Sequence, residues 1–497
     1  MVQWTIGQNS IAHWVNLCVQ APWKCVKTVN GSPGLPIFSM KCGAREEPLV
    51  HLWSHEKNLT RRVIRLKEQA ADRIVLEVHR LGKSKPGRLE FLRTDSPRPA
   101  GRITREQFRA RFDRILAEAF PDAHSESLSA APDLEHSFSG MYVRGRMHEG
   151  ASDWAFLAAS PSENATAIDG MLAFGLLWLD WTRGHSDRRA VEGLRLFVPE
   201  GSSRILRERV LALSTIARTE IYEFSEPDSQ MKKIDPADAG NLDSSLVSRR
   251  DVESTLAAAR DWLARIRALI PGTAGAIETR VPPKTSELVF SFRGLEFARW
   301  TREGLLFGIG ESIEKLTTTK IPSLECNIRQ LNLHRNSLAA DTKNYFYRAA
   351  PERWLKTLVL EDPSRLDAQL DPKFLYSQVP ALNGGDRGVL DLLGVTRRGR
   401  LVIVELKASE DIQMPIQAVD YWLRVRRHQR EGDFQRFGYF SGIDLDPKPP
   451  LVWLVAPGLR FHSATEILLK YLSPEIQISR IGVNENWRRG IKVVFRQ

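Results

Sequence analysis

Cysteine is scarce in this chain of 497 residues. Only Cys18, Cys25, Cys42 and Cys326 occur, and none of them belongs to a CxxC pair. Four scattered thiols do not make a disulfide scaffold, and without paired cysteines a zinc ribbon is not expected. The composition therefore fits a reducing, intracellular compartment best.

Long apolar runs are also lacking. The longest, 168–181, is shorter than the ~20 residues that a membrane-spanning helix needs, and it contains Asp169 and Asp180. The first residues do not show the basic segment and apolar segment of a secretory signal. The sequence contains no GxxxxGK[ST] loop, which argues against an intrinsic ATPase or helicase. These absences predict a cytoplasmic protein without a membrane partner.

Positive charge is what the chain has in surplus. Lysine and arginine number 71 against 60 aspartates and glutamates, which gives a net charge of +11. Such a surplus favours a polyanionic partner such as nucleic acid, while a charge balance set by solubility is the alternative. Hydrophobic residues make up 42% of the chain, a globular value. The length predicts about two to five domains.

The hydrophobic periodicity divides the chain into segments. Alternating strand patterns predict a β-rich module over 1–100 and a β-hairpin module over 271–345. Mixed helix and strand patterns predict two α/β sandwich domains, over 101–225 and 346–497, each with a mixed sheet. A stretch rich in Asp, Ser and Pro, followed by one helix, predicts a linker over 226–270.

The two halves of the chain resemble each other. FLAAS at 156–160 aligns with ELKAS at 405–409, LRLFVPEG at 194–201 aligns with LVWLVAPG at 451–458, and a similar hairpin precedes each domain. The shared order predicts a tandem duplication of a β-hairpin module plus an α/β sandwich domain. The alternative is that any two α/β domains share short apolar matches.

An otherwise apolar strand in the second half carries two charges. In LVIVELKAS, Glu405 and Lys407 lie two residues apart and therefore face the same side. Their burial costs several kcal/mol unless they are paired or bound to a ligand. Asp391 lies in the preceding strand and reaches Glu405 if the two strands form a hairpin. A hard divalent ion, Mg²⁺ or Mn²⁺, would relieve the repulsion between the carboxylates.

This arrangement resembles the PD-(D/E)XK nuclease superfamily, in the branch of the Holliday-junction resolvases, NucS endonucleases and RecB-like nucleases. The order is a helix with an acid, a strand with a lone aspartate, a turn, a strand ending in ExK and a helix with a glutamine, here Glu352, Asp391, Glu405, Lys407 and Gln417. The resemblance covers about 346–497 and implies a restriction-endonuclease-like fold.

A second motif and one departure belong to the same resemblance. Gln417-Ala-Val-Asp-Tyr421 is similar to the RecB-type QxxxY motif. Leu390 stands where the family has a proline before the aspartate. For Tyr421 the alternative is an ordinary core residue, and for Gln417 it is a capping or solvent-facing residue.

The resemblance implies a metal site. Asp391 and Glu405, with the backbone carbonyl of Leu406, would hold Mg²⁺ or Mn²⁺. Glu352 would reach the same ion through water or hold a second one.

The resemblance also assigns roles beyond the metal. Lys407 would orient or polarise the attacking water, and Gln417 would position Lys407 or the phosphate. The alternative is that Glu405 and Lys407 form an internal ion pair in an inactive relative.

Several arginines are candidates for contacts with nucleic-acid phosphates. They come from the turn before the ExK strand, from the following helix and from the second hairpin: Arg397, Arg398, Arg400, Arg424, Arg427, Arg293 and Arg299. A solvated charged surface is the alternative for such a group.

The first half has no such charges, because Phe156 and Ala158 align with Glu405 and Lys407. It is therefore predicted to be a degenerate nuclease-like copy. The resemblance predicts a metal-dependent endonuclease that hydrolyses phosphodiester bonds in DNA, in DNA repair or phage defence. It would act as a homodimer or an intrachain pseudo-dimer, with or without defence or repair partner proteins. The alternatives are a nucleic-acid-binding scaffold with a vestigial motif and a ligand-gated nuclease acting on DNA or RNA.

Overall fold

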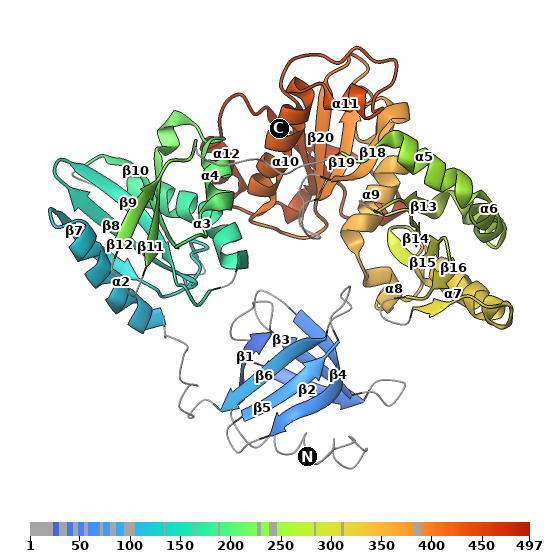
Figure 1. Cartoon of the computed structure of the whole chain (residues 1–497), viewed down its shortest axis with the longest axis horizontal. Helices are drawn as coiled ribbons and strands as arrows, with labels where there is room; N and C mark the ends of the chain where they lie inside the picture. Colours follow the sequence, from blue (N-terminus) through green and yellow to red (C-terminus); the bar gives the residue numbers. More distant parts are fainter. Residues whose placement is uncertain are drawn as a thin grey trace. The chain divides into compact units, whose positions relative to one another are not determined.

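The chain folds into two compact units, Met1–Thr104 and Arg105–Gln497. The computed structural model describes residues 23–28, 37–42, 48–53, 58–69, 73–79, 86–93, 105–133, 135–163, 165–186, 189–225, 230–237, 246–282, 285–309, 313–380 and 389–497. These residues form four β-sheets and the helices that pack on them (Figure 1). Within the described ranges, none of the helices has the length and hydrophobicity needed to cross a bilayer.

The N-terminal unit contains one antiparallel sheet of six strands in the order β1-β6-β5-β4-β3-β2. The strands are β1 (Trp23–Thr28), β2 (Ile37–Cys42), β3 (Pro48–Trp53), β4 (Asn58–Gln69), β5 (Arg73–Val78) and β6 (Gly87–Arg93). The hairpin expected in this region is β5–β6. The alternating apolar residues that predicted it place Leu76 and Val78 in the interior.

The first mixed sheet, β7–β12, has the order β12-β11-β10-β9-β8-β7. Its central strands β9, β10 and β11 are parallel, and the outer pairs are antiparallel. Helix α2 covers one face, where Phe112 packs on Phe156, and α3 covers the other (Figure 1). The elements are α2 (Arg105–Ala119), β7 (Ala123–Ser129), β8 (Tyr142–Glu149), β9 (Ser152–Ala159), α3 (Ala165–Gly184), β10 (Val191–Pro199), α4 (Arg204–Val210), β11 (Thr219–Ser225) and β12 (Gln230–Ile234).

The second mixed sheet, β18–β23, repeats this topology. Its order is β18-β19-β20-β21-β22-β23, again with three parallel central strands and antiparallel outer pairs. The elements are α9 (Pro351–Glu361), β18 (Tyr376–Pro380), β19 (Val389–Val395), β20 (Leu401–Leu406), α10 (Met414–Arg430), α11 (Asp433–Arg436), β21 (Leu451–Pro457), α12 (Thr465–Lys470), β22 (Ile478–Val483) and β23 (Val493–Arg496). The prediction of α/β domains with mixed sheets is confirmed.

Strand β20 is buried on both faces, which explains its uninterrupted apolar sequence. Leu401 and Ile403 belong to the core that includes α10, whereas Val402 and Val404 belong to the core that includes α9. A strand of this kind has room for a charged side chain only near its end. Glu405 is the first charged residue of β20, one position before its end.

The polar segment expected to be a linker contains a strand. Within the predicted linker, β12 pairs with β11 as the outermost strand of the first mixed sheet. β7, at the opposite edge, is equally polar. Edge strands pack against the sheet on one side only and keep polar residues exposed, so their sequences lack the apolar run of a central strand.

The third sheet, β13–β17, is an antiparallel meander of five strands. The expected second hairpin is β14–β15. The sheet has one strand fewer than the N-terminal sheet and a different strand order, so the repeated topology is limited to the two mixed sheets. The elements here are α5 (Arg249–Ala258), α6 (Arg260–Ala268), β13 (Ile277–Arg280), β14 (Leu288–Phe292), β15 (Leu295–Thr301), β16 (Gly304–Phe307), β17 (Glu314–Lys315), α7 (Ile321–His334) and α8 (Tyr345–Arg348).

One arginine fastens the third sheet to the start of α9. The fully buried Arg335 donates hydrogen bonds to the carbonyls of Arg293, Phe346, Ala349 and Ala350 at 2.6–3.1 Å. Burial lowers its pKa to about 9. A guanidinium with several fixed N–H groups suits a position where so many carbonyls converge.

Gly294, in the turn between β14 and β15, allows this close approach. Its φ is +77°, and a Cβ there would lie 2.4 Å from the Cβ of Arg353 on α9. We expect Gly294→Ala to lower the free energy of unfolding by about 1–3 kcal/mol, because backbone strain and overpacking add. Chemical denaturation measures the effect. Gly272→Ala, with open space around the added methyl group, is the control, and equal losses in both variants would contradict the packing argument.

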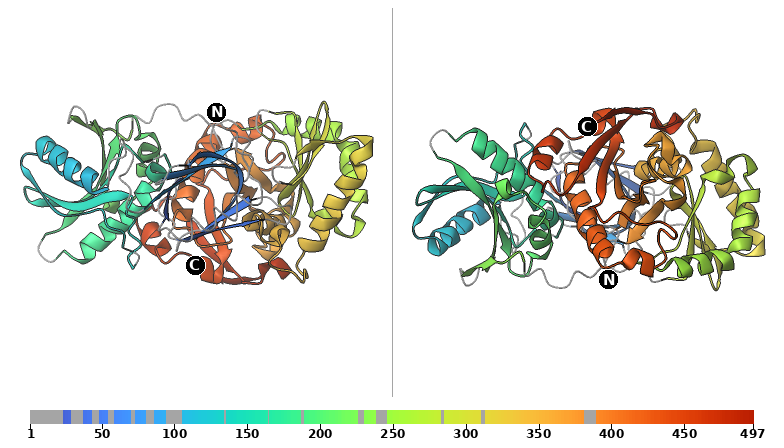
Figure 2. Two further views of the ribbon diagram at one scale, coloured as in Figure 1. Left: turned by 90° about the horizontal axis from the view of Figure 1, so that it is seen from below. Right: turned by 90° about the horizontal axis from the view of Figure 1, so that it is seen from above.

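The domains of the two mixed sheets meet in a reciprocal contact. Leu213 forms a β-bridge with Leu472. On either side of it, the Ser214 N–H donates to the Tyr471 carbonyl at 2.9 Å and the Ser473 N–H donates to the Ala212 carbonyl at 2.8 Å. Around it, α3 contacts α12 and α4 contacts α10 (Figure 2). Exchanging the two domains exchanges these contacts, so the arrangement is that of an approximate two-fold axis.

Candidate metal centre

The β19–β20 hairpin brings Asp391 and Glu405 together. Leu392 pairs with Val404 in this antiparallel hairpin. Asp391, just before Leu392, therefore lies opposite Glu405, just after Val404. The Leu406 N–H donates to Oδ2 of Asp391 at 3.0 Å. Burial raises the pKa of Asp391 although this hydrogen bond and nearby cations oppose the shift. The predicted proximity of the two carboxyl groups is thus present.

Glu405 is 2% exposed and only partly satisfied. Its Oε1 lies 3.3 Å from Nζ of Lys407, while its Oε2 is buried without a hydrogen-bond partner in the structure. Burial, and then the charge of Asp391, raise the pKa of Glu405 well above its usual value. An orphaned carboxylate oxygen beside a second carboxylate is costly in a protein interior and suits a cation.

Lys407 is held between acids. Its Nζ lies 3.1 Å from Oδ2 of Asp411 in addition to its contact with Glu405. Burial alone would lower the pKa of Lys407, but the carboxylates of Glu405, Asp411 and Glu352 outweigh it and raise the pKa. Lys407 is therefore a cation at neutral pH. The sequence analysis did not single out Asp411, although its spacing of four residues from Lys407 was a usable signal.

Glu352 approaches the same centre from the first turn of α9. The Ala408 N–H donates to its carboxylate, while burial and the charges of Asp391 and Asp411 raise its pKa. Ala350, before Pro351, has a left-handed backbone with φ of 42°, a conformation that costs energy outside glycine. The start of α9 is thus held in place by the packing around it.

The glutamine and tyrosine of the second motif lie on one side of α10, four residues apart. Tyr421 is 7% exposed. Burial and the charges of Glu405 and Asp391 raise its pKa, so its ring is both a core residue and a neighbour of the carboxylates. Gln417 is partly buried in the first turn of α10.

Lys356 is a further charged residue that the sequence analysis missed. It lies one turn after Glu352 on α9 and is 4% exposed. Burial lowers its pKa, while Glu278 and Asp391 act in the opposite direction. The spacing of four residues in a helix was the signal that could have found it.

The three arginines of the β19–β20 turn lie far from the carboxylates. Glu405 is four residues from the turn end of β20, or roughly 13 Å at about 3.3 Å per residue. Arg397 donates to the Ala368 carbonyl and Arg400 to the Pro449 carbonyl. The side chain of Arg398 is exposed at this same end. The three do not lie beside the carboxylates, because a hairpin puts its turn opposite its open end, and their contacts with phosphates stay a prediction.

The arginines on α10 are used inside the protein. Arg424, expected at a phosphate, is 3% exposed and donates to Oε2 of Glu208 in the first domain at 2.6 Å. That prediction is wrong, since the guanidinium does not reach the surface. Arg427 is exposed but pairs with Glu431, at 2.9 Å, near the end of the helix away from Gln417.

The two hairpin arginines also have partners. Arg293 donates to the Arg335 carbonyl at 2.5 Å and lies over the ring of Trp354. Arg299 forms ion pairs with Glu296 at 2.8 Å and Glu287 at 3.2 Å. Their predicted phosphate contacts would compete with these interactions.

The strand pairings of the two mixed sheets shift the alignment of FLAAS with ELKAS by one residue. Glu405 pairs with Leu454, and Leu157 pairs with Leu196. Both partners lie three residues before the proline that ends their strand. Leu157 therefore takes the ladder position of Glu405, whereas Phe156 points to the opposite face, toward α2. β9 does take the place of β20, as predicted, but with another register.

By the same count, Ala159 rather than Ala158 matches Lys407. Leu157 and Ala159 both belong to the core shared with α3. Neither side chain can bind a metal, so this edge of the first mixed sheet has no equivalent of the carboxylate pair.

A second group of potential ligands lies at the end of α10. Ligand atoms of His428, Glu431 and Asp433 lie within 4.8 Å of one another. His428 Nδ1 is 2.6 Å from Asp433, which also pairs with Arg436, and Glu431 pairs with Arg427. Asp433 Oδ1 also lacks a hydrogen bond, but it forms an ion pair with Arg436, whereas Glu405 Oε2 has neither a hydrogen bond nor an ion pair among the described residues.

The carboxylate centre fits a hard divalent cation. It offers two buried carboxylates from adjacent strands and an orphaned oxygen, and Mg²⁺ and Mn²⁺ prefer oxygen ligands. Glu352 lies nearby, but among the described residues its ligand atoms and those of Asp391 and Glu405 do not all come within 4.8 Å of one another. No protein-family model and no curated protein matches this chain. The chemistry of the centre therefore rests on its own geometry.

Proposed function

We propose that the protein is a Mg²⁺-dependent endonuclease that hydrolyses phosphodiester bonds in DNA. The observation that supports this most is the buried, unpartnered Oε2 of Glu405 beside Asp391. In the proposal Asp391, Glu405 and the Leu406 carbonyl hold the ion, with Glu352 as a further acid. A bound Mg²⁺ supplies Lewis-acid stabilisation of a phosphoryl oxygen and a lowered pKa of bound water.

The protein's own residues have separate tasks in this proposal. Lys407, kept cationic by its acidic neighbours, orients the attacking water and offsets the negative charge that grows on the phosphoryl group. Asp411 holds the ammonium of Lys407 in place. Gln417, from α10, positions Lys407 or the phosphate.

We further propose that the two mixed-sheet domains are restriction-endonuclease-like copies that arose by duplication. Their identical strand order and their reciprocal contact around Leu213 and Leu472 support this. The first copy, without ligands at its equivalent edge, would serve as an intrachain pseudo-dimer partner of the second. DNA repair or phage defence in the cytoplasm is the setting that suits such an enzyme.

The Glu405–Lys407 ion pair favours one second candidate. In a nucleic-acid-binding scaffold with a vestigial motif, this pair would replace the metal. The two proposals differ in metal affinity, since an active centre binds Mg²⁺ or Mn²⁺ and a vestigial one does not.

Incubation with labelled DNA tests the proposal. We expect the full-length protein to cleave at least one of a set of duplex, branched, mismatched and single-stranded DNAs in Mg²⁺ or Mn²⁺. EDTA should abolish cleavage and added metal should restore it, because the carboxylates repel each other without a cation. Parallel RNA substrates test the choice of nucleic acid. Cleavage that persists in EDTA would contradict the metal site, and thermal stabilisation by Mn²⁺ without cleavage would contradict the nuclease.

A further inference from the structure

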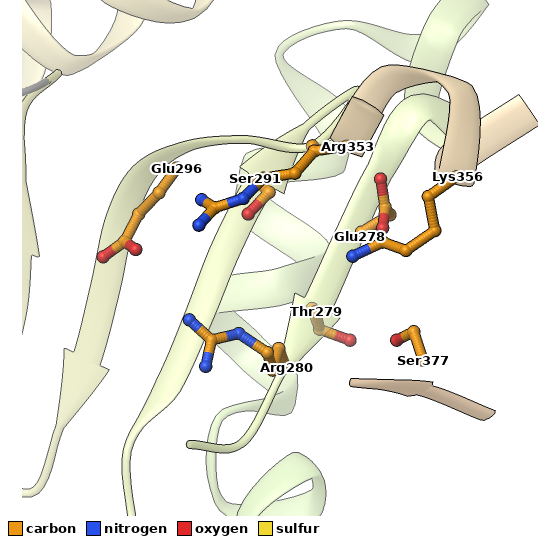
Figure 3. Close-up of a pocket in the computed structure, with 9 residues that line it drawn as sticks. Glu278, Thr279, Arg280, Ser291, Glu296, Arg353, Lys356 and Ser377 are labelled. Atoms are coloured by element: carbon orange, nitrogen blue, oxygen red, sulfur yellow. The ribbon is translucent and has the colours of Figure 1, made fainter. Parts of the chain in front are cut away.

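A pocket opens beside the carboxylate centre, where the third sheet meets α9. It encloses about 360 Å³, its solvent-open mouth included. Its lining comes from β13, the β14–β15 hairpin, α9 and β18 (Figure 3): Glu278, Thr279, Arg280, Ser291, Gly294, Glu296, Arg353, Lys356 and Ser377. The lining side chains are all polar or charged, which indicates a polar ligand.

Both acids of the pocket are already engaged. Glu278, on β13, accepts a hydrogen bond from the Thr357 hydroxyl, and burial raises its pKa. Glu296, on β15, forms an ion pair at 2.8 Å with Arg299, a residue that does not line the pocket. Each acid therefore already has one partner before any ligand arrives.

Two of the three cations that line the pocket, Lys356 and Arg353, have fewer partners. Lys356 is almost fully buried, yet among the described residues it has no hydrogen bond or ion pair. Arg353, in the same helix turn, likewise has no such partner there. Figure 3 shows the guanidinium groups of Arg353 and Arg280 on the same side of the pocket and the Thr279 and Ser377 hydroxyls facing each other. Because Lys356 and Arg353 are donors without acceptors among the described residues, they predict an anionic ligand.

Lys356 connects the pocket with the carboxylate centre. Its ammonium interacts electrostatically with Glu278 on the pocket side and with Asp391 on the other. Glu352 lies one turn before it, and side chains four residues apart on a helix are separated by about 5–6 Å. That separation is short enough for neighbouring phosphates of one strand to lie at the carboxylate centre and at the pocket.

We infer that this pocket binds a backbone phosphate of the strand that is cleaved, one or two nucleotides from the scissile phosphate. The inference rests on the proposed nuclease function and names the substrate group that the enzyme holds. Arg353 and Arg280 contact the phosphate oxygens. The positive charge of Lys356 lies between this phosphate and the metal centre. Because Gly294 and Arg335 fix the third sheet on α9, the distance between the two phosphate positions is set by the fold.

Binding without turnover tests this inference. The full-length chain carrying Glu405→Gln is titrated in Mg²⁺ against fluorescein-labelled duplex and single-stranded DNA at several salt concentrations. We expect Arg353→Ala and Lys356→Met each to reduce the slope of log affinity against log salt by about one. Arg204→Ala, which removes an exposed arginine on α4 in the first mixed-sheet domain, should leave the slope unchanged. Arg353 is exposed, so its variant remains informative if Lys356→Met does not fold.

Methylphosphonate substitution identifies the phosphate. Neutralising one internal phosphate should weaken binding to the intact pocket several-fold and have no further effect on Arg353→Ala, because each change removes the same contact. Equal slopes for Arg353→Ala and Arg204→Ala would overturn the inference. The inference would also be overturned if binding were sensitive only to a 5′-terminal phosphate, because the pocket would then bind strand ends.

The same experiments separate this inference from the nuclease proposal. If no DNA is cut in any metal but the pocket variants still lose salt dependence, the nuclease proposal fails and the phosphate pocket stands. If DNA is cut and the pocket variants bind like the parent chain, only the pocket inference fails.

Discussion

Replacing Glu405 by glutamine is expected to abolish DNA cleavage while leaving the protein folded. The amide keeps the shape of the side chain but loses the charge that holds the metal next to Asp391. We expect a loss of at least about 10²–10³-fold, the range observed when one electrostatic stabiliser of a transition state is removed. Initial rates of cleavage in saturating Mg²⁺ measure the effect.

Glu410→Gln is the matched control, since it makes the same chemical change at an exposed position five residues along the chain. It should retain the parent activity. Full activity in Glu405→Gln, or in Asp391→Ala, would refute the assignment of the centre.

The same variant is expected to be more stable than the parent without metal. The folded-state pKa of Glu405 is raised above the ordinary value of 4.5, so the folded protein binds more protons than the unfolded chain there. Stability then falls as the pH rises through and above 4.5, up to the folded pKa. Glu405→Gln removes this contribution and should add about 0.5–2 kcal/mol at neutral pH.

Melting temperatures between pH 4 and pH 8 would show this as a flatter profile for Glu405→Gln. Mg²⁺ should raise the melting temperature of the parent and not that of the variant. A steeper loss of stability with pH in the variant would contradict the assignment of this pH dependence to Glu405.

Loss of Arg209 is expected to destabilise the contact between the two mixed-sheet domains by about 3–5 kcal/mol. Arg209 is 2% exposed and bonds Asp420 on α10 through two nitrogens, at 2.8 and 2.6 Å, and Asp169 on α3 at 2.6 Å. Arg209→Ala leaves the buried carboxylate of Asp420 without this guanidinium. The shift of the unfolding midpoint in urea measures the loss.

Arg204→Ala, at an exposed position of the same helix α4, is the control and should change stability by less than about 0.5 kcal/mol. Adding Asp420→Asn to Arg209→Ala should recover part of the loss, because the unpaired charge is then gone. Equal effects of Arg204→Ala and Arg209→Ala would refute the role of this buried group. Since α10 also carries Gln417, cleavage should fall in Arg209→Ala even where the protein remains folded.

The sequence by itself determined the features that depend on local pattern. The apolar runs of β20 and β21 and the helical spacing of α9 and α10 predicted their positions. A strand that is buried on both faces is apolar throughout, and a packed helix is apolar at every third or fourth residue. The charges of Glu405 and Lys407 stood out for the same reason. Asp391 followed from the hairpin, since a short turn pairs its neighbouring strands. The polar edge strands β7 and β12 gave no such signal.

Only the tertiary structure decided what the charged residues do. Arg424 looks like any surface arginine in the sequence, but it binds Glu208, more than two hundred residues earlier. Lys356 faces the pocket because the third sheet packs on α9, and the register of β9 depended on its pairing with β10. Charged side chains are long and choose partners across the fold, so their roles depend on distances that sequence spacing does not contain.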